Sequence, residues 1–281
     1  MKYLNLGCGS RFHKQWKNLD FYVNSSDVIG YNLIKGIPFE NKFFDVVYHC
    51  HLLEHFKKYQ AKGFLQECYR VLSIQGTIRV VVPDLEKITR CYIDKLEASL
   101  SDPSVAPDYE WILIELFDQM VREQSGGDMG KLLTSGNIPN QAFILKRIGL
   151  EAQRIIQSPE QKQTLASYNW QQIILKTIRK LKTWGYGKEL LIRLLLNKQD
   201  YAALKIGRFR QSGEVHQWMY DRYSLKRLLE ECGFVDIKQC AAHESRIPDW
   251  ISFNLDTEPD GTVYKPDSLY MEATKPPNDN S

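Results

Sequence analysis

The sequence predicts an α/β fold built on a doubly wound, mostly parallel sheet, and three observations support this. Short apolar runs alternate with helical stretches through residues 1–84, as in strand–helix–strand units. The first apolar run ends in Gly7-Cys8-Gly9, where a chain can turn tightly out of a strand. The third observation is the β-branched run that ends at Val82, which is typical of a strand buried on both faces.

Each element of residues 1–84 follows from its apolar pattern. One helix, Ala61–Leu72, carries apolar residues at helical spacing, and Gly76 ends that unit. The connection from Gly9 to Asn18 leaves room for only one or two helical turns, so the first crossover is short. Strand and helix in alternation imply parallel pairing with right-handed crossovers. We expect strands over Tyr3–Leu6, Asn18–Val23, Val28–Leu33, Phe44–His49 and Thr77–Val82.

Residues 85–213 show helical patterns and no convincing strand, which predicts a helical insertion. A helix through Trp111 is expected to stop at Gly126-Gly127, and another is expected after Pro139. Further helices are expected over about 159–182 and over Leu190–Leu196.

The α/β pattern resumes in residues 214–275. Ser224 is expected to N-cap a helix that ends at Gly233. The closing strands are expected over Phe234–Ala241 and Leu269–Thr274. Residues 276–281, rich in proline and asparagine, predict a disordered tail.

The composition is that of a globular chain with a sizeable core. Of the 281 residues, 43% are apolar and 25% are charged. The six cysteines are scattered, with no Cys-x-x-Cys pair and no ligand-spaced Cys/His cluster, so we expect no metal site. Neither a signal peptide nor a membrane-spanning run is recognisable, which favours a cytoplasmic location.

Positive charge is concentrated in one stretch. Residues 171–210 contain ten Lys/Arg and two Asp/Glu, while the whole chain carries a net charge of +3. This stretch is interpreted as a solvated face, as a lid over a substrate, or as peripheral contact with an anionic membrane. The sequence contains no known nucleic-acid-binding motif and its net charge is low, so we do not expect nucleic acid as a partner. Nothing in the pattern sets the oligomeric state.

Gly7, Gly9 and Asp20 together indicate a nucleoside pocket. Glycines at a strand end let the backbone approach a ligand, and an acidic residue after the next strand accepts hydrogen bonds from ribose hydroxyls. A tight turn without ligand remains the alternative for the glycines, as a solvent-facing turn does for Asp20.

Five segments follow one another along the chain: Leu4–Gly9, Pro38-Phe39 with Phe44–Tyr48, His51–His55, Glu67–Leu72 with Gly76, and Val80–Asp84. In this order they resemble the motifs of class I S-adenosylmethionine-dependent methyltransferases. The short first crossover and the His-Leu-Leu-Glu-His segment resemble those of the type 11 methyltransferase-domain group. The resemblance covers residues 1–84 and fits 214–275, but it does not extend to the insertion. It implies a Rossmann-like sheet of seven strands whose last strand is antiparallel, with S-adenosylmethionine as cofactor.

The resemblance also implies roles for individual residues. An imidazole of His51 or His55 could take a proton from a hydroxyl or amine as the methyl group moves, so these two are the candidate catalytic residues. Alternatively, Glu54 and His55 only tie their segment to its neighbours. Arg11 stands where the motif has a third glycine, and it either folds over the pocket or points to solvent. The candidate cofactor-binding residues are Leu6, Gly7, Cys8, Gly9, Asp20, Asn32, Leu33 and His49.

The expected reaction is methyl transfer to an oxygen or nitrogen atom of a small-molecule or glycan-like acceptor. A general base is needed only for a poorly nucleophilic acceptor, because the sulfonium cofactor is already a strong electrophile. Two other functions are considered. One is a nicotinamide-dependent oxidoreductase, against which the Phe44–Tyr48 and His51–His55 segments speak. The other is a non-catalytic cofactor-binding protein that uses the insertion as an interface.

Overall fold

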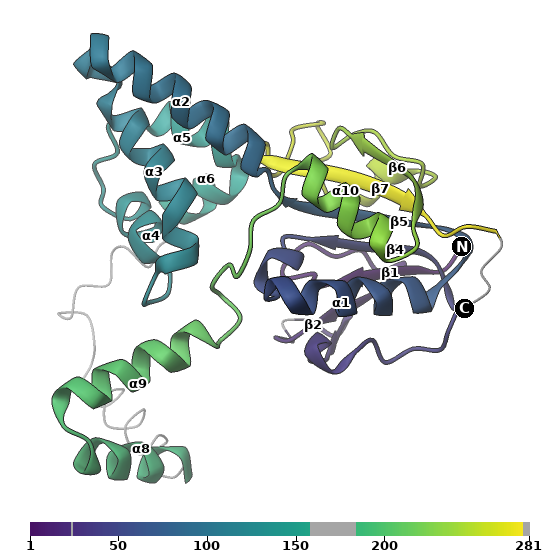
Figure 1. The fold of residues 1–281 in the computed structure, drawn as a ribbon, viewed down its shortest axis with the longest axis horizontal. Coiled ribbons are helices and arrows are strands. Elements are labelled where there is room, and N and C mark those ends of the chain that lie inside the picture. Colours follow the sequence, from purple (N-terminus) through teal and green to yellow (C-terminus); the bar gives the residue numbers. More distant parts are fainter. Residues whose placement is uncertain (24, 158–183, 278–281) are drawn as a thin grey trace.

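The centre of the molecule is a seven-stranded sheet (Figure 1). The computed structural model describes residues 1–23, 25–157 and 184–277. The strand order is β3-β2-β1-β4-β5-β7-β6, and within this sheet only β7 runs antiparallel to its neighbours. The predicted fold class is therefore confirmed. The strands are β1 Tyr3–Leu6, β2 Trp16–Asp20, β3 Val28–Gly30, β4 Phe44–Cys50, β5 Leu72–Pro83, β6 Val235–Cys240 and β7 Ser268–Thr274.

Helices cover one face of the sheet and fill the chain between β5 and α10. In that stretch the described residues form helices and no strand. The helix expected over about 159–182 lies outside the described residues. So does the first part of the basic stretch, whose remainder forms α8 and α9. The helices are α1 Lys58–Val71, α2 Leu85–Ser101, α3 Ala106–Val121, α4 Gly127–Leu133, α5 Gln141–Ile148, α6 Leu150–Gln157, α8 Trp184–Leu195, α9 Lys198–Arg210 and α10 Arg222–Glu231.

Two strands end earlier than their apolar patterns predict, because polar side chains turn the chain. β2 ends at Asp20, whose carboxylate accepts the Tyr22 N–H at 2.9 Å. β3 ends at Gly30, because Asn32 accepts the Ile34 N–H at 3.0 Å and caps the 3₁₀ turn Leu33–Lys35. Both turns place polar groups just beyond the carboxyl ends of the strands.

The predicted N-cap of α10 is wrong by three residues. Asp221 is the N-cap, and its carboxylate accepts the backbone N–H groups of Tyr223 and Ser224. The Ser224 hydroxyl accepts the Asp221 N–H in return, at 3.0 Å. Ser224 is thus the third residue of a reciprocal capping box, which satisfies more of the free N–H groups of the first turn than a serine cap alone. The chain turns at Gly233, as predicted, with φ +93°.

The two faces of the sheet are covered differently. One face packs against α1 and α10, which lie side by side (Figure 1), and Leu65 and Leu225 are fully buried there. The other face packs against the loop between β6 and β7, through an aromatic cluster that contains Trp16 and Trp250. Both clusters consist largely of apolar side chains removed from water, the main source of folding free energy.

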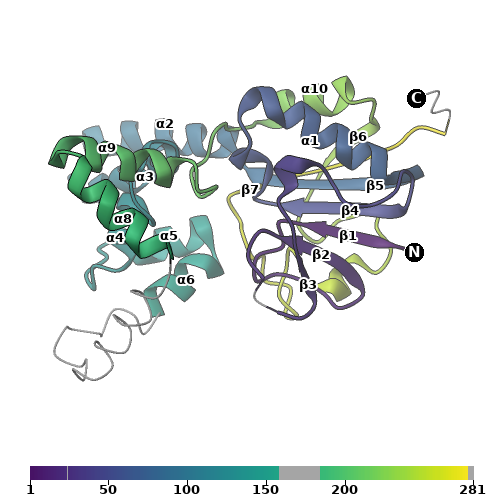
Figure 2. The ribbon, with the colours of Figure 1, turned by 90° about the horizontal axis from the view of Figure 1, so that it is seen from below.

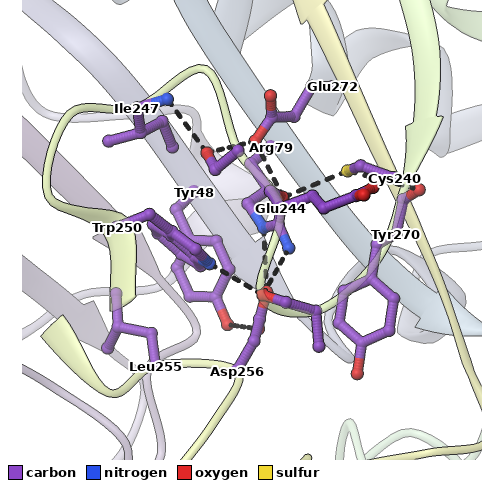
Figure 3. Close-up of polar contacts among 12 residues, drawn as sticks. Tyr48, Arg79, Cys240, Glu244, Ile247, Trp250, Leu255, Asp256, Tyr270 and Glu272 are labelled. Atoms are coloured by element: carbon purple, nitrogen blue, oxygen red, sulfur yellow. Dashed lines mark hydrogen bonds and ion pairs between the residues drawn. The ribbon is translucent and has the colours of Figure 1, made fainter. Parts of the chain in front are cut away.

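A buried arginine holds the β6–β7 loop to the sheet (Figure 3). Arg79 of β5 is fully buried and donates to Asp256 at 2.8 Å and to Glu272 at 2.7 Å. Asp256 also accepts the Tyr48 hydroxyl at 2.6 Å. Because a buried charge needs partners, these contacts fix the path of the loop. The loop then carries Lys265 towards the carboxyl ends of β1 and β4.

The helices α2 to α6 extend beyond the end of β5 and have a core of their own, which includes Trp111 and Ile144 (Figures 1 and 2). The chain leaves the sheet at Asp84 and returns at Tyr220, where the Leu85 N–H donates to the Tyr220 carbonyl at 3.0 Å. The helices between these points therefore lie at the edge where ligands of open α/β sheets bind. No helix in the described ranges combines the length and apolar character needed to cross a membrane.

Candidate active site

The turn after β1 requires glycine at position 7. Gly7 has φ +62°, and its N–H donates to the Leu19 carbonyl at 2.8 Å. A Cβ at Gly7 would lie 2.8 Å from the Leu52 side chain, closer than packed carbon atoms approach. Gly9 also has a positive φ, of +52°. The turn after β1 thus places two residues without side chains, Gly7 and Gly9, at the carboxyl end of the sheet.

Asp20 joins the end of β2 to this turn. Its Oδ2 accepts the Gly9 N–H at 2.8 Å, and its Oδ1 accepts the Tyr22 N–H at 2.9 Å. A carboxylate offers about four lone-pair sites, so each oxygen can accept a further hydrogen bond from a ligand. The geometry fits an acceptor of ribose hydroxyl groups.

A cleft of about 550 Å³ lies beside the turn. Four of the candidate cofactor residues line it, namely Gly7, Asp20, Asn32 and Leu33. Both candidate catalytic residues, His51 and His55, line it as well. The remaining lining residues are Phe21, Tyr22, Tyr31, Ile34, Leu52, Phe56, Gln60 and Gln211–Glu214.

A smaller hollow of about 220 Å³ adjoins the cleft. Gly7 and His51 line both spaces, while Cys8 and Gly9 line only the smaller one. Its other lining residues are mostly polar: Asn5, Ser10, Arg11, Tyr48, Cys50, Glu151, Leu255, Tyr264 and Lys265. Gly7 and His51 therefore mark the boundary between two adjoining spaces.

Leu6 and His49 lie behind the site. Both are fully buried, and neither lines the cleft or the smaller hollow. The His49 ring packs against Phe64, with ring centroids 5.3 Å apart. Burial lowers the pKa of His49 to about 3, so the ring is neutral.

Arg11 neither folds over the cleft nor points to solvent. It donates to Glu258 at 2.6 Å and to the backbone carbonyls of Asn254 and Thr257. Its guanidinium lies 4.2 Å from the centre of the Tyr264 ring. Where the family motif has a third glycine, this chain uses an arginine to hold the β6–β7 loop against the first turn.

His51 follows β4 in a left-handed backbone conformation, with φ +50°. Such a conformation is unfavourable for a residue with a Cβ, and it is enriched at functional sites. The Nε2 atom lies 2.8 Å from the Ser268 hydroxyl, and Nδ1 lies 3.3 Å from a Glu54 carboxylate oxygen. Both ring nitrogens of His51 thus face protein groups.

Burial and nearby cations keep the histidines around Glu54 neutral. Burial, with a smaller contribution from Lys265, lowers the pKa of His51 and lowers that of His55 to about 4. His216 lies against His55, with ring centroids 4.8 Å apart, and burial lowers its pKa as well. Burial raises the pKa of Glu54 to about 8. Neutral imidazoles are proton acceptors and metal ligands.

Several residues of the site have no signal in the local sequence. Gln211–Glu214 line the cleft at the end of the helical region, and Lys265 forms an ion pair of 2.6 Å with Glu151 beside the smaller hollow. These residues belong to no motif and come from distant parts of the chain. Tyr22 and Tyr31 also line the cleft, close in sequence to the predicted residues Asp20 and Asn32. Aromatic residues beside these two positions are the sequence signal by which they could have been predicted.

Comparison with known proteins gives a family match and several structural likenesses. Residues 14–80 match the type 11 family described as a methyltransferase domain. A search of curated proteins finds no significant match.

Among solved structures, an S-adenosylmethionine-dependent methyltransferase from Archaeoglobus fulgidus is 12% identical, with a TM-score of 0.35, over 98% of this chain and 86% of that chain. A methyltransferase from Thermotoga maritima, described as a possible histamine N-methyltransferase, is 10% identical, with a TM-score of 0.36, over 98% of this chain and 82% of that chain. A phosphoethanolamine N-methyltransferase from Haemonchus contortus, in complex with phosphomonomethylethanolamine and S-adenosylhomocysteine, is 10% identical, with a TM-score of 0.35, over 98% of this chain and 50% of that chain.

The family match covers β2, β3, β4 and α1 and extends into β5. These elements carry Asp20, Asn32 and the His51–His55 segment, and β1 leads directly into them through the glycine turn. Residues 14–80 thus match the type 11 methyltransferase domain, and they form part of the seven-stranded, Rossmann-like sheet that the resemblance to class I S-adenosylmethionine-dependent methyltransferases implied.

Proposed function

We propose that the chain transfers the methyl group of S-adenosylmethionine to an oxygen or nitrogen atom of a small, polar, glycan-like acceptor. The observation that carries this proposal is the junction of two spaces at Gly7 and His51. The larger space has the groups expected for a nucleoside cofactor, and the smaller one has the polar lining expected for the acceptor.

On the cofactor side, backbone and carboxylate groups fit S-adenosylmethionine. Asp20 would accept hydrogen bonds from the ribose hydroxyls, and the absence of a Cβ at Gly7 leaves room for the methionyl part. Asn32 keeps its amide NH₂ group available to a ligand, because its carbonyl oxygen already accepts the Ile34 N–H. When bound, the cofactor supplies the electrophilic methyl group.

On the acceptor side, the size and polarity of the smaller hollow favour a compact polar group. Its volume of about 220 Å³ is below that of most drug-binding pockets, which hold roughly 300–1,000 Å³. Lys265, Glu151 and Tyr264 offer hydrogen-bond donors and acceptors suited to hydroxyl or amine groups. A sugar-like acceptor satisfies both properties.

His51 lines both spaces, which supports it as the proton acceptor. An acceptor hydroxyl that replaced the Ser268 hydroxyl at Nε2 would give its proton to that nitrogen as its oxygen takes the methyl group from the sulfonium, whose carbon–sulfur bond breaks to leave S-adenosylhomocysteine. Glu54 faces the other ring nitrogen and would orient the ring. His51 therefore acts as a base only for acceptors that bind with a proton on the reacting oxygen or nitrogen atom.

An acceptor screen tests the proposal, with release of S-adenosylhomocysteine as the readout. We expect turnover with hydroxyl- or amine-bearing small molecules, and about a 10²–10⁴-fold lower rate in His51→Gln. His13→Gln is the matched control, since His13 lines neither space.

Two results would overturn the proposal. A chain that binds S-adenosylhomocysteine but methylates nothing in the screen would favour the non-catalytic interaction protein. A chain that binds NAD and neither sulfur nucleoside would favour the oxidoreductase.

A further inference from the structure

A buried polar cluster lies next to the cleft and is formed by Glu54, His55 and His216. Glu54 and His55 belong to the 3₁₀ turn Leu53–His55 after β4, while His216 comes from the segment that follows α9. Backbone hydrogen bonds hold the two segments together, because the Gln217 N–H donates to the Glu54 carbonyl at 2.6 Å. The cluster is therefore part of the packed fold.

Four polar atoms of this cluster make no hydrogen bond, although His51 Nδ1 lies 3.3 Å from one Glu54 carboxylate oxygen. Both carboxylate oxygens of Glu54 and the Nδ1 atoms of His55 and His216 are buried without a hydrogen bond. Glu54 is fully buried, and His216 is 5% exposed. Buried polar groups are nearly always hydrogen-bonded or bound to an ion, so this concentration of free atoms calls for a ligand.

The donor set is one that divalent transition metals prefer. Two imidazoles and one carboxylate form the protein ligands of several catalytic Zn²⁺ sites, and the same set binds non-haem Fe²⁺. One candidate ligand atom from each of the three side chains lies within 4.8 Å of the others. Ligand atoms of a tetrahedral Zn²⁺ site lie roughly 3.4 Å apart for bonds of about 2.1 Å. Small side-chain rotations would close that difference.

The cations near the cluster are paired with other carboxylates. Lys265 is neutralised by Glu151 at 2.6 Å and Arg122 by Asp118 at 2.7 Å.

We propose that Glu54, His55 and His216 bind one divalent transition-metal ion of the Zn²⁺ class. Because His55 also lines the cleft, a coordination position left open by the protein would lie beside that cleft. The ion would also link the 3₁₀ turn after β4 to the chain returning from the helices.

Metal binding to the full-length chain tests this directly, without reference to methyl transfer. The purified protein is stripped with a chelator, dialysed and titrated with ZnCl₂ by calorimetry. We expect one ion per chain, and at least 100-fold weaker binding in Glu54→Gln, His55→Gln and His216→Gln. His243→Gln is the matched control, because this histidine is exposed and should bind the ion as the wild type does.

Titration with Co²⁺ gives a second readout that needs no variant. A site of two imidazoles and a carboxylate produces visible d–d bands without the near-ultraviolet thiolate-to-cobalt band that the six cysteines would cause. Absence of a stoichiometric ion in the folded wild type would overturn the proposal, as would a thiolate band. Unchanged affinity in the three variants, each shown to be folded by circular dichroism, would overturn it too. S-adenosylhomocysteine binding, measured in parallel, tests the proposed function separately.

Discussion

Replacing Asp20 separates its role in the loop from its role toward a ligand. In the structure the carboxylate accepts two backbone N–H groups, those of Gly9 at 2.8 Å and Tyr22 at 2.9 Å. Both contacts are at the surface, so water can replace the lost acceptor in Asp20→Ala. We therefore expect a loss of at most about 1 kcal/mol in the free energy of unfolding.

The effect on cofactor binding should be much larger. A hydrogen bond to a charged group contributes about 1.5–3 kcal/mol. Loss of two ribose contacts in Asp20→Ala would then cost roughly 3–6 kcal/mol, a factor of about 10²–10⁴ in Kd. Asp20→Asn keeps one acceptor oxygen without the charge, so its loss should be about 10–100-fold.

The assay is calorimetric titration with S-adenosylhomocysteine, together with urea unfolding of each variant. Asp27→Ala is the control, because Asp27 is an exposed carboxylate in the same connection between β2 and β3. A folded Asp20→Ala chain that bound the ligand within threefold of wild type would show that Asp20 makes no ribose contact. Equal losses in both alanine variants would point to net charge as the cause.

Three further substitutions test the parts of the fold that hold the site in place. Arg79→Met leaves the buried carboxylates of Asp256 and Glu272 without their cation, so urea unfolding should show a free energy of unfolding lower by about 3–5 kcal/mol. An unchanged unfolding midpoint would show that these two ion pairs do not stabilise the fold. Gly7→Ala adds a Cβ 2.8 Å from a leucine side chain at φ +62°, so both stability, by about 1–3 kcal/mol, and S-adenosylhomocysteine affinity should fall. Gly63→Ala, in the interior of α1 with open space around its Cβ, should instead stabilise the chain by about 0.5–1 kcal/mol. Destabilisation by Gly63→Ala would argue against the described α1 packing.

Much of the sheet can be predicted from the sequence, because strand and helix periods are local properties. The runs of β1, β4 and β7 were predicted to within a residue or two of their observed bounds. The ends of β2 and β3 were predicted too late, since Asp20 and Asn32 turn the chain through side-chain hydrogen bonds that the apolar pattern does not register. The N-cap of α10 was misplaced for a related reason, because Asp221 and Ser224 cap the helix together.

The sequence by itself determined the sheet, the glycine turn and the acidic residue beside it. Gly7 and Asp20 lie near one another in the chain, and parallel strands bring their carboxyl ends to one edge, so their meeting at the cleft was predictable. Only the tertiary structure decided how the smaller hollow and the cluster of Glu54, His55 and His216 are formed. Lys265 and Glu151 reach the smaller hollow, and His216 reaches the cluster, from three distant segments whose meeting no local spacing records. Their positions depend on how the helical region and the β6–β7 loop pack against the sheet, and that packing is a property of the whole core. The cluster of Glu54, His55 and His216, and the metal site proposed for it, could therefore be recognised only from the tertiary structure.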